Sequence, residues 1–478
     1  MGESPYRIYP GANVPRLGEG VSSSVTPRAI LLGPTNSAGA GTPPYRIPPP
    51  VRLTAQKSPQ PLYGAIDISV VDEDGPPDGL TLDAAIDRLV QANNELLVKF
   101  QEIPKADADI LTAGLRNNPL IFASADNVPY GNYSPSRPGE TNYSATVIQA
   151  IDINRKRLDR IRVAQTAKRV LESQYQDAVR LEIDNLFTAY IDVLRAHATV
   201  RYAEVGLKGI SEIVELTKKA AAKAVQPKID VDRALIQQAH AEIALKDAHT
   251  ALHQAKQTLA VLLNIPADQV DAIALRGSLR SGGAAIAPAE ELAAIAIDAR
   301  PDLVAFRIGV QRAQAEVGLA VKERVTDVYL LYTPYGIRDN RPTGGQNATS
   351  WGLSAMVSLP IFNRNQGNIR RAEINVYQTQ LELAGLERLV VSEVHKAAQD
   401  ASSSQAAVDR FEKQILPSAG RIRDAARLSY TQGQESLVSY LNAQRDYNDI
   451  ANQYLDALAR HRRNVLKLNT VVGQRIQP

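Results

Sequence analysis

Two histidines are the first residues whose type and spacing could do chemistry. His249 and His253 are four residues apart in a helical pattern, a spacing that places both imidazoles on one helix face and can hold a metal ion. No third ligand is evident in the sequence, and Lys246 and Lys256 lie close by. We therefore expect a solvated or packed pair and predict no metal site.

Other chemical signatures are missing from the sequence. It has no cysteine, which excludes disulfides, thiolate metal sites and cysteine nucleophiles. It has no phosphate-cradling glycine loop, no nucleophile elbow and no zinc-protease helix signature. We predict no enzyme, no catalytic residue and no cofactor. The net charge is +3, with 54 basic and 51 acidic residues, so nucleic acid is not an expected partner.

Composition describes an ordinary folded chain with an unusual beginning. Of 478 residues, 44% are hydrophobic and 22% are charged. No run of about 20 apolar residues predicts a transmembrane helix, and no signal peptide is visible at the start. The first 60 residues are rich in Pro, Gly and Ser, and "SPYRIYPG" (4–11) is echoed by "PPYRIPPP" (43–50). We expect an extended or disordered segment there, and a docking motif is the alternative.

The rest of the chain is organised as a two-fold internal repeat. "SATVIQAIDINRKRLDR" (144–160) is echoed by "SAMVSLPIFNRNQGNIRRAE" (354–373), and each changes from a strand pattern to a helical one. Other anchors recur at nearly the same offset. The predicted organisation is a Pro/Gly/Ser-rich segment, a first repeat, an inter-repeat segment, a second repeat and a tail: 1–79, 80–264, 265–287, 288–473 and 474–478.

Each repeat is predicted to contain the same elements in the same order. A helix begins near Thr81, a plausible N-cap, or near Pro288, a first-turn proline. Two strands, a long helix and a returning helix follow. The strands are predicted at 119–130, 142–153, 327–337 and 350–362, the long helices at 155–224 and 365–432, and the returning helices at 228–264 and 434–469. A helix of roughly 70 residues would be about 100 Å long.

Heptad spacing predicts that these helices pack as coiled coils. One apolar seam of the first returning helix consists of Val231, Ala234, Ala241, Leu245, Ala248, Leu252, Ala255, Leu259 and Leu262. In the second returning helix, Tyr440, Tyr447 and Tyr454 are seven residues apart, and we interpret them as core residues rather than as a binding site.

The predicted strands suit a membrane better than a soluble sheet. Each has about 10 to 13 residues, enough to cross a bilayer at a tilt, and aromatic residues gather on them. Two hairpins cannot close a barrel, and lipid does not tolerate open sheet edges. If these strands span a membrane, several chains must contribute to one barrel.

At this point the sequence resembles the TolC family of outer-membrane efflux proteins, from about residue 80 to 473. The residues that carry the resemblance are "ARPDLVAFRIGVQRAQAEVGLAVKERVTDVYL" (299–330), "SAMVSLPIFNRNQGNIRRAE" (354–373) and "YTQGQESLVSYLNAQRDY" (430–447). The resemblance implies a mainly α fold with membrane β: a homotrimer with a twelve-stranded barrel, an α-helical barrel and an equatorial segment at 265–287.

The resemblance also implies a function and a location. The chain would be the exit duct of a tripartite efflux or type I secretion-like system, passing small molecules, ions or exported polypeptide passively. It would span the outer membrane of a diderm bacterium, reach into the periplasm, and contact outer-membrane lipid, a periplasmic adaptor and an inner-membrane pump.

Site residues follow from the same resemblance, position by position. An aperture is expected at Asp230, Tyr430, Ser439 and Asn442, and adaptor-contact tips at Ala224, Val225, Gly433 and Gln434. Membrane-interface aromatics are expected at Tyr130, Tyr143, Tyr329, Tyr335, Trp351 and Phe362. Asp230 has a second interpretation that stays open, as a carboxylate favoured by a helix N-terminus.

An alternative function belongs to a different class. The chain could be a periplasmic coiled-coil adaptor or structural protein that never enters a membrane. An adaptor would carry one helical hairpin and soluble domains with many strands. Two hairpins and four long strands favour the duct.

Overall fold

The computed structural model describes residues 75–134, 136–222, 228–280, 286–341 and 344–476. The two "PYRI" segments and the predicted tip residues Ala224 and Val225 lie outside these ranges. All the described residues belong to one of the two compact units of the chain, Lys57–Pro478. The predicted N-terminal segment therefore stays untested.

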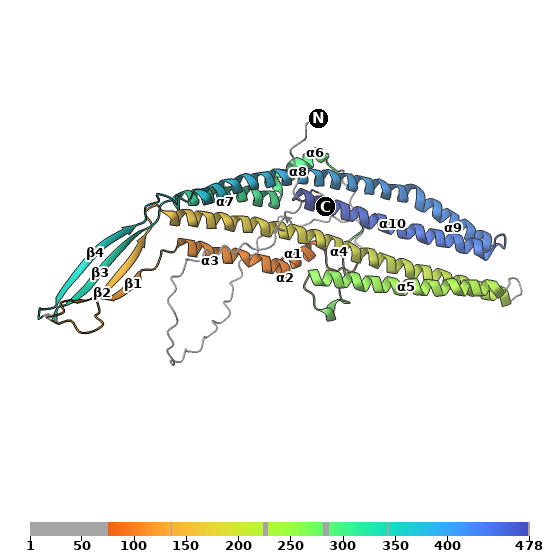
Figure 1. The fold of residues 1–478 in the computed structure, drawn as a ribbon. Coiled ribbons are helices and arrows are strands. Elements are labelled where there is room, and N and C mark those ends of the chain that lie inside the picture. The colour runs from red at the N-terminus through yellow and green to blue at the C-terminus, as the bar shows by residue number, and fades with distance from the viewer. Residues whose placement is uncertain (1–74, 135, 223–227, 281–285, 342–343, 477–478) are drawn as a thin grey trace, which may run out of the picture. The chain divides into compact units, whose positions relative to one another are not determined.

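The order helix, strand, strand, long helix, returning helix occurs twice in the described residues (Figure 1). The first set is α1 (Leu82–Ala92), α2 (Asn94–Phe100), α3 (Glu102–Gly114), β1 (Leu120–Asp126), β2 (Thr141–Ile151), α4 (Lys156–Ala222) and α5 (Lys228–Leu262). After a 3₁₀ turn (Ala267–Gln269), the second set is α6 (Ala289–Ala299), α7 (Pro301–Lys322), β3 (Val328–Asp339), β4 (Ala348–Val357), α8 (Gln366–Arg410), a π turn (Phe411–Ile415), α9 (Leu416–Thr431) and α10 (Leu437–Val472).

Helix starts follow the capping residues in the sequence. Thr81 caps α1 as predicted, because its Oγ1 accepts a hydrogen bond of 3.3 Å from the Ala84 N–H. Asn93 then ends α1 and caps α2, since its side chain accepts from Glu95 N and Leu96 N. Pro301 opens α7 at a position where its missing N–H costs nothing.

The two strand-to-helix joints are close to where the sequence places them, but the second strand of the second repeat ends earlier. β4 stops at Val357, so the prediction of a strand reaching residue 362 was wrong. Pro360 cannot donate to a sheet ladder, and the Ile361 N–H turns back onto Leu359 O at 2.8 Å. Helix α8 then begins after Asn365, which has a left-handed φ of 58°.

The long helix of the second repeat is interrupted, which the sequence pattern did not predict. A π turn at Phe411–Ile415 separates α8 from α9, and Leu416 N donates to Phe411 O. Pro417 lies in the first turn of α9 and has no N–H to give. A π turn is one way for a helix to pass a proline without losing its direction.

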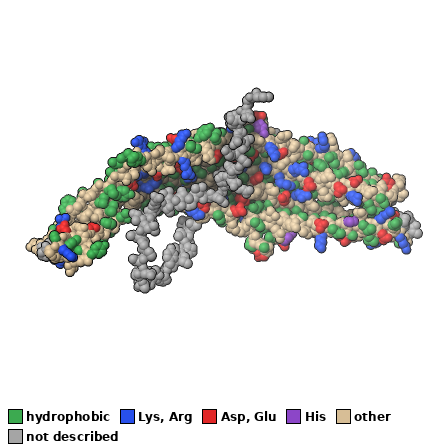
Figure 2. All heavy atoms as spheres, viewed as in Figure 1, with side chains coloured by type: hydrophobic (Ala, Val, Ile, Leu, Met, Phe, Trp, Pro, Cys, Tyr) green, Lys and Arg blue, Asp and Glu red, His purple; other side chains and the backbone are tan. Residues whose placement is uncertain are grey.

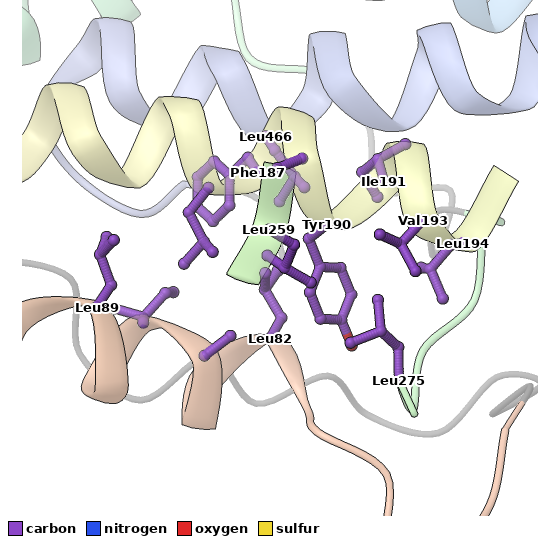
Figure 3. Packing of buried hydrophobic residues seen from close by; sticks show 14 of the residues in the cluster. Leu82, Leu89, Phe187, Tyr190, Ile191, Val193, Leu194, Leu259, Leu275 and Leu466 are labelled. Carbon is purple, nitrogen blue, oxygen red and sulfur yellow. The ribbon is translucent and has the colours of Figure 1, made fainter. Parts of the chain in front are cut away.

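The helices pack around a core near the junction of the two repeats (Figure 3). Tyr190 of α4 is 2% exposed there. Its hydroxyl lies 2.9 Å from Leu80 O and 2.8 Å from Arg276 O. The Tyr190 hydroxyl thus contacts both the segment that precedes α1 and the segment that follows α5. These two segments also pair with each other through a parallel β-bridge between Leu80 and Leu275. The inter-repeat segment is fixed to the start of the first repeat in this way.

Burial confirms the predicted seam of α5. Ala234, Ala248 and Leu259 are buried, and the other members of the seam are half-buried. α5 packs along α4, and α10 packs along α4, α8 and α9. Charged side chains of both signs are dispersed over the outer helix surfaces (Figure 2). None of the described helices is long and apolar enough to cross a lipid bilayer.

Candidate functional site

The turn between α9 and α10 is built around Gly433. This glycine has a φ of +74°, a left-handed conformation that favours glycine. Gln434 N donates to Ser429 O at 2.9 Å, and Gly433 N donates to Tyr430 O at 3.0 Å. These two bonds form a Schellman motif, which satisfies the last carbonyls of α9. Ser436 then caps α10 by accepting from Ser439 N.

Tyr430 connects the two helical hairpins just inside this turn. Its hydroxyl lies 3.0 Å from Thr217 Oγ1 of α4, and Thr217 is fully buried. Because Thr217 Oγ1 donates to Ile213 O, it accepts from the Tyr430 hydroxyl. The Tyr430 ring stacks on Tyr440 of α10 with 5.9 Å between centroids. One apolar cluster, which also includes Ala234 of α5, thus joins four helices.

The predicted aperture residues differ in exposure. Asp230 begins α5, is 17% exposed, and lies 3.4 Å from the Arg233 guanidinium. Ser439 and Asn442 of α10 are exposed, whereas Tyr430 is buried. The Ser439 hydroxyl donates to Glu435 Oε2 at 2.9 Å. The structure therefore pairs Tyr430 with Thr217, and Ser439 with Glu435. Among the hydrogen bonds of the described residues, none joins Asp230 to either pair.

Sequence reasoning missed Thr217 and Glu435. Thr217 lies 213 residues before Tyr430, so no local pattern connects them. Glu435 follows Gln434 in the turn and precedes the capping Ser436, a position where an acidic residue is expected near a helix N-terminus. That signal was available in the sequence.

The four strands form one antiparallel sheet in the order β1-β2-β3-β4, and its two faces differ in chemistry. Register across the sheet places Ile121, Val147, Tyr332 and Leu353 in one row of one face. The same face carries Ala123, Ala145, Tyr143, Ile337, Tyr335 and Trp351. We call it the apolar face.

The opposite face is rich in hydroxyl groups, and we call it the hydroxyl face. One of its rows consists of Ser124, Ser144, Gly336 and Ser350. Thr146 and Thr333 form another, and their hydroxyls are 2.8 Å apart. A bulge in β3 around Pro334 keeps both faces in register across the sheet.

The predicted interface aromatics lie at two levels of the sheet. Tyr143, Tyr335 and Trp351 lie near the end that carries the strand-connecting loops, and Tyr130 lies in the first loop. Tyr329 pairs with Met356 near the helical end, and Phe362 follows β4 there with 90% of its side chain exposed. Tyr329 is in register with Ala150 and therefore belongs to the hydroxyl face, whereas Tyr143, Tyr335 and Trp351 belong to the apolar face.

A buried ionic cluster, which no sequence pattern predicted, joins helices from both repeats. Arg300 is 3% exposed. Its guanidinium binds both carboxylate oxygens of Asp302 at 3.1 and 2.6 Å and reaches Glu393 of α8 at 2.6 Å. Burial raises the pKa of the Asp302 carboxyl, but the Arg300 hydrogen bonds and charge outweigh burial and leave that pKa below its usual value.

Arg180 of α4 extends the same cluster. Its guanidinium binds Asp177 at 2.6 Å and the Thr470 carbonyl of α10 at 3.1 Å, and it lies 3.8 Å from Asp302. Helices α4, α7, α8 and α10 thus meet at one charged centre. Every carboxylate here has a guanidinium partner, which is the arrangement expected of a structural clamp rather than of a metal or proton site.

The histidine pair does not come together as a ligand set. His253 Nδ1 lies 2.8 Å from Asp271 Oδ1, and its Nε2 lies 2.9 Å from Gln257 Nε2. His249 is exposed. In the described part of the chain, no group of three His, Asp or Glu side chains is placed to hold a metal ion.

Comparison with known proteins adds a family and a fold. Residues 292–474 match the outer membrane efflux protein family. The cobalt-zinc-cadmium resistance protein CzcC of Cupriavidus metallidurans is 23% identical over 406 residues, which cover 83% of this chain and 90% of that protein.

Solved structures resemble the fold over most of its length. The crystal structure of CusC, described for its folding and transmembrane channel formation, superposes with a TM-score of 0.66 at 18% identity, covering 82% of this chain and 92% of CusC. The Campylobacter jejuni CmeC outer membrane channel gives 0.67 at 15% identity, covering 82% and 85%. These likenesses establish the fold.

Proposed function

We propose that this chain is a member of the outer membrane efflux protein family, whose model matches residues 292–474, and that three copies assemble into one exit duct. It is a transport duct rather than an enzyme. In the proposed assembly, the sheets close into one twelve-stranded barrel in the outer membrane, and the helices continue as a tunnel through the periplasm. An adaptor and an inner-membrane pump complete the system at the hairpin turns.

The sheet is the observation that carries the proposal. Its outer strands β1 and β4 each pair on one side only within the described chain. Large apolar side chains on it are exposed, including Ile121 at 79%, Trp351 at 72% and Leu353 at 60%. A soluble sheet with open edges and such a surface would aggregate, and lipid does not tolerate the edges. Closure with sheets of further copies satisfies both requirements.

The two sheet faces supply the chemistry of a barrel wall. The apolar face suits hydrocarbon, and the hydroxyl face suits a water-filled lumen, as in other membrane barrels whose residues alternate between the two. Aromatic side chains at both ends of the strands match the two lipid interfaces. We assign Tyr130, Tyr143, Tyr335 and Trp351 to one interface and Phe362 to the other, whereas Tyr329, on the hydroxyl face, would point into the lumen.

The hairpin turns are the proposed inner end of the duct. Asp230 would contribute three carboxylates, one from each copy, and Glu435 beside Ser439 would contribute three more. Such rings favour cations over anions. Gly433 and Gln434, with Ala224 and Val225 of the other turn, are the proposed adaptor contacts. The repeat boundaries at 80–264 and 288–473 remain part of the proposal.

The cargo that we propose to test first is a divalent metal ion. The relative CzcC is named for resistance to cobalt, zinc and cadmium. A duct for such ions should not retain them, and this chain has no cysteine, two methionines and six histidines. Few strong ligands are therefore available along a wall to bind passing soft metal ions.

The adaptor alternative is less favoured by the fold. An adaptor would need soluble β domains, whereas the described residues contain one four-stranded sheet whose large apolar residues are exposed. The described fold also has two helical hairpins, which a duct requires, whereas an adaptor would carry one.

The test is membrane fractionation of the full chain followed by mass measurement in detergent. We expect extraction only by detergent and a protein mass three times that of the 51.9 kDa chain. A monomer that is recovered in the soluble fraction would overturn the duct and favour the adaptor class.

A further inference from the structure

The segments that join the sheet to the helices hold an excess of positive charge. They lie at the helical end of the four strands (Figure 1), and we call them the collar: residues 115–119, 152–162, 321–327 and 358–373. The collar contains eleven Arg and Lys residues and five Asp and Glu residues, a net charge of +6, whereas the whole chain has +3. The remainder of the chain is therefore net negative, and the positive charge is concentrated at one level.

Hydrogen bonds hold the collar segments against one another. The Asn154 side chain donates to Lys322 O, and the Asn365 side chain donates to Ala320 O, both at 2.8 Å. A threonine hydroxyl before β3 also donates to a backbone carbonyl after β4 at 2.9 Å. The joints of both repeats are thus fixed to the end of α7, so the charged side chains around them extend from one ordered backbone framework.

Four of the five acidic residues of the collar already have partners within it. Asp152 accepts two backbone N–H groups at the start of α4. The other three form ion pairs at 2.6, 2.6 and 3.2 Å: Asp159 with Lys322, Asp327 with Lys156 and Glu373 with Arg370. These carboxylates are committed to two lysines, one arginine and a helix start, and they leave most of the collar arginines without a counter-charge.

Seven arginines of the collar have exposed side chains and form no ion pair with any described residue. Among them are Arg116 before β1, Arg155 after β2, Arg324 before β3 and Arg364 after β4. Within the described chain, the guanidiniums of these four form one hydrogen bond, from Arg364 Nε to Ile361 O at 3.3 Å. The helical end of every strand therefore carries a guanidinium that is available to an anionic partner.

Exposed apolar side chains stand beside these arginines in both repeats. Ile153 precedes Arg155 by two residues, and Phe362 precedes Arg364 by two residues. Ile153 is 56% exposed and Phe362 is 90% exposed. A phospholipid offers both matching chemistries, because its acyl chains are apolar and its phosphate is an anion that a guanidinium can bind through two N–H groups.

We propose that the collar binds anionic phospholipid of the membrane leaflet that faces the periplasm. This inference rests on the proposed outer-membrane duct and assigns a lipid class to its periplasmic side. The apolar side chains would lie among the acyl chains, and the arginines would reach the phosphates beside them. Clusters of basic residues next to a membrane span recognise anionic lipid in this way, and each Lys or Arg near the surface strengthens binding about fivefold.

The test is native mass spectrometry of the detergent-purified full chain with phosphatidylglycerol or phosphatidylethanolamine of the same acyl chains added. We expect the natural chain to retain more phosphatidylglycerol, because that lipid carries a net negative charge and phosphatidylethanolamine does not. The triple variant Arg155→Gln/Arg324→Gln/Arg364→Gln should lose this preference. Its binding of phosphatidylglycerol should weaken about fivefold for each arginine removed.

The matched control is Arg427→Gln/Arg445→Gln/Arg460→Gln, which removes three exposed arginines of α9 and α10 outside the collar. It changes the net charge by the same amount and should keep the preference. A trimer by mass that shows no preference, or that loses it equally in both triple variants, overturns the lipid assignment and leaves the duct intact. A soluble monomer overturns the duct and the lipid assignment together.

A collar that lines the tunnel instead of facing lipid would give another result. The triple collar variant would then shift the reversal potential across a planar bilayer toward cation selectivity, since it removes positive charge from the ion path. Phospholipid binding would stay as in the natural chain. That combination would also overturn the lipid assignment.

Discussion

At the level of single residues, His461 shows how burial decides protonation. It lies on α10 with 3% of its surface exposed, and its Nδ1 is 3.1 Å from the Ser404 hydroxyl of α8. Burial lowers the pKa of His461, and the neighbouring Arg462 lowers it further, whereas the Ala401 carbonyl and Asp409 act in the opposite direction. The folded imidazole therefore takes up a proton less readily than it does in the unfolded chain.

This predicts a loss of stability in mild acid. The unfolded chain protonates His461 near its ordinary pKa of 6.5, before the folded chain does. The contribution of His461 to the free energy of unfolding should therefore be fully present above pH 6.5. It should be lost as the pH falls toward the lower pKa of the folded state. Each unit of pKa difference is worth about 1.4 kcal/mol.

The measurement is the thermal midpoint in detergent at pH 7.5 and pH 5.5. His461→Gln should lose less stability between the two pH values than the natural chain, whereas the exposed His249→Gln should lose as much. An equal acid-induced loss in the natural chain and His461→Gln would contradict the assignment.

Asp230 leads to a second prediction at this scale. If its carboxylates ring the inner end of the duct, Asp230→Asn removes three negative charges and should weaken cation selectivity. The reversal potential across a planar bilayer under a KCl gradient should move toward zero. Asp268→Asn, an exposed carboxylate remote from the turns, is the control. Unchanged selectivity in Asp230→Asn would remove Asp230 from the aperture.

Residue pairing was the least predictable part of the site. The sequence identified Tyr430 as a turn aromatic, but its partner Thr217 comes from the other repeat. Arg300 and Asp302 are neighbours in sequence, yet Arg180 and Glu393 reach them only because four helices converge. Such contacts depend on tertiary placement, which local patterns do not encode.

At the level of elements, the α9–α10 turn depends on the left-handed conformation of Gly433. No atom lies within 4 Å of a Cβ built there, so alanine would meet no steric clash. It would still pay about 1 kcal/mol or more for the left-handed backbone. Gly433→Ala should therefore loosen the turn, which faster amide exchange at residues 437–441 would reveal.

Gly206→Ala, a substitution within a helix, should raise stability where Gly433→Ala lowers it. Gly206 lies in α4, where a Cβ would also have open space. Alanine should stabilise that helix by about 0.5–1 kcal/mol. If both variants change stability in the same direction, backbone conformation is not the cause.

Element boundaries were predicted best where a local rule applies. Thr81 caps α1 and Pro288 immediately precedes α6, both as predicted, and both joints near Asn154 and Asn363 were found by the change of hydrophobic period. The end of β4 was missed because the alternating pattern continues to Phe362 although the hydrogen bonds stop at Val357. The π turn was missed because Pro417 alone cannot indicate how a helix accommodates it.

At the level of the whole molecule, the two sheet faces predict opposite responses to charge. Leu353→Lys places an ammonium on the apolar face, where a lipid-facing lysine costs about 2–4 kcal/mol near the bilayer centre. Ser350→Lys places the same group on the hydroxyl face, which would line a water-filled lumen in the proposed barrel. The first variant should reduce the amount of assembled trimer in membranes, and the second should leave it unchanged.

The measurement is the yield of trimer extracted from the membrane fraction at equal expression. Equal losses in both variants, or a loss confined to Ser350→Lys, would mean that the apolar face does not meet lipid. Strand length and the gathering of aromatic residues predict a membrane sheet, and the sheet itself is present, whereas its place in a membrane stays a prediction. They did not reveal which face carries the hydroxyls, because that depends on strand register and on the bulge in β3.

In the proposed duct, the hydrogen bond between Tyr430 and Thr217 would oppose any opening that draws α9 away from α4. Such an opening breaks this bond while Thr217 keeps its bond to Ile213 O, so the cost in each copy is about 0.5–1.5 kcal/mol, the net worth of one hydrogen bond. Three copies that opened together would lose about 1.5–4.5 kcal/mol, which would lower the open population by roughly one to three orders of magnitude. A docked partner would have to supply that energy before the periplasm could drain.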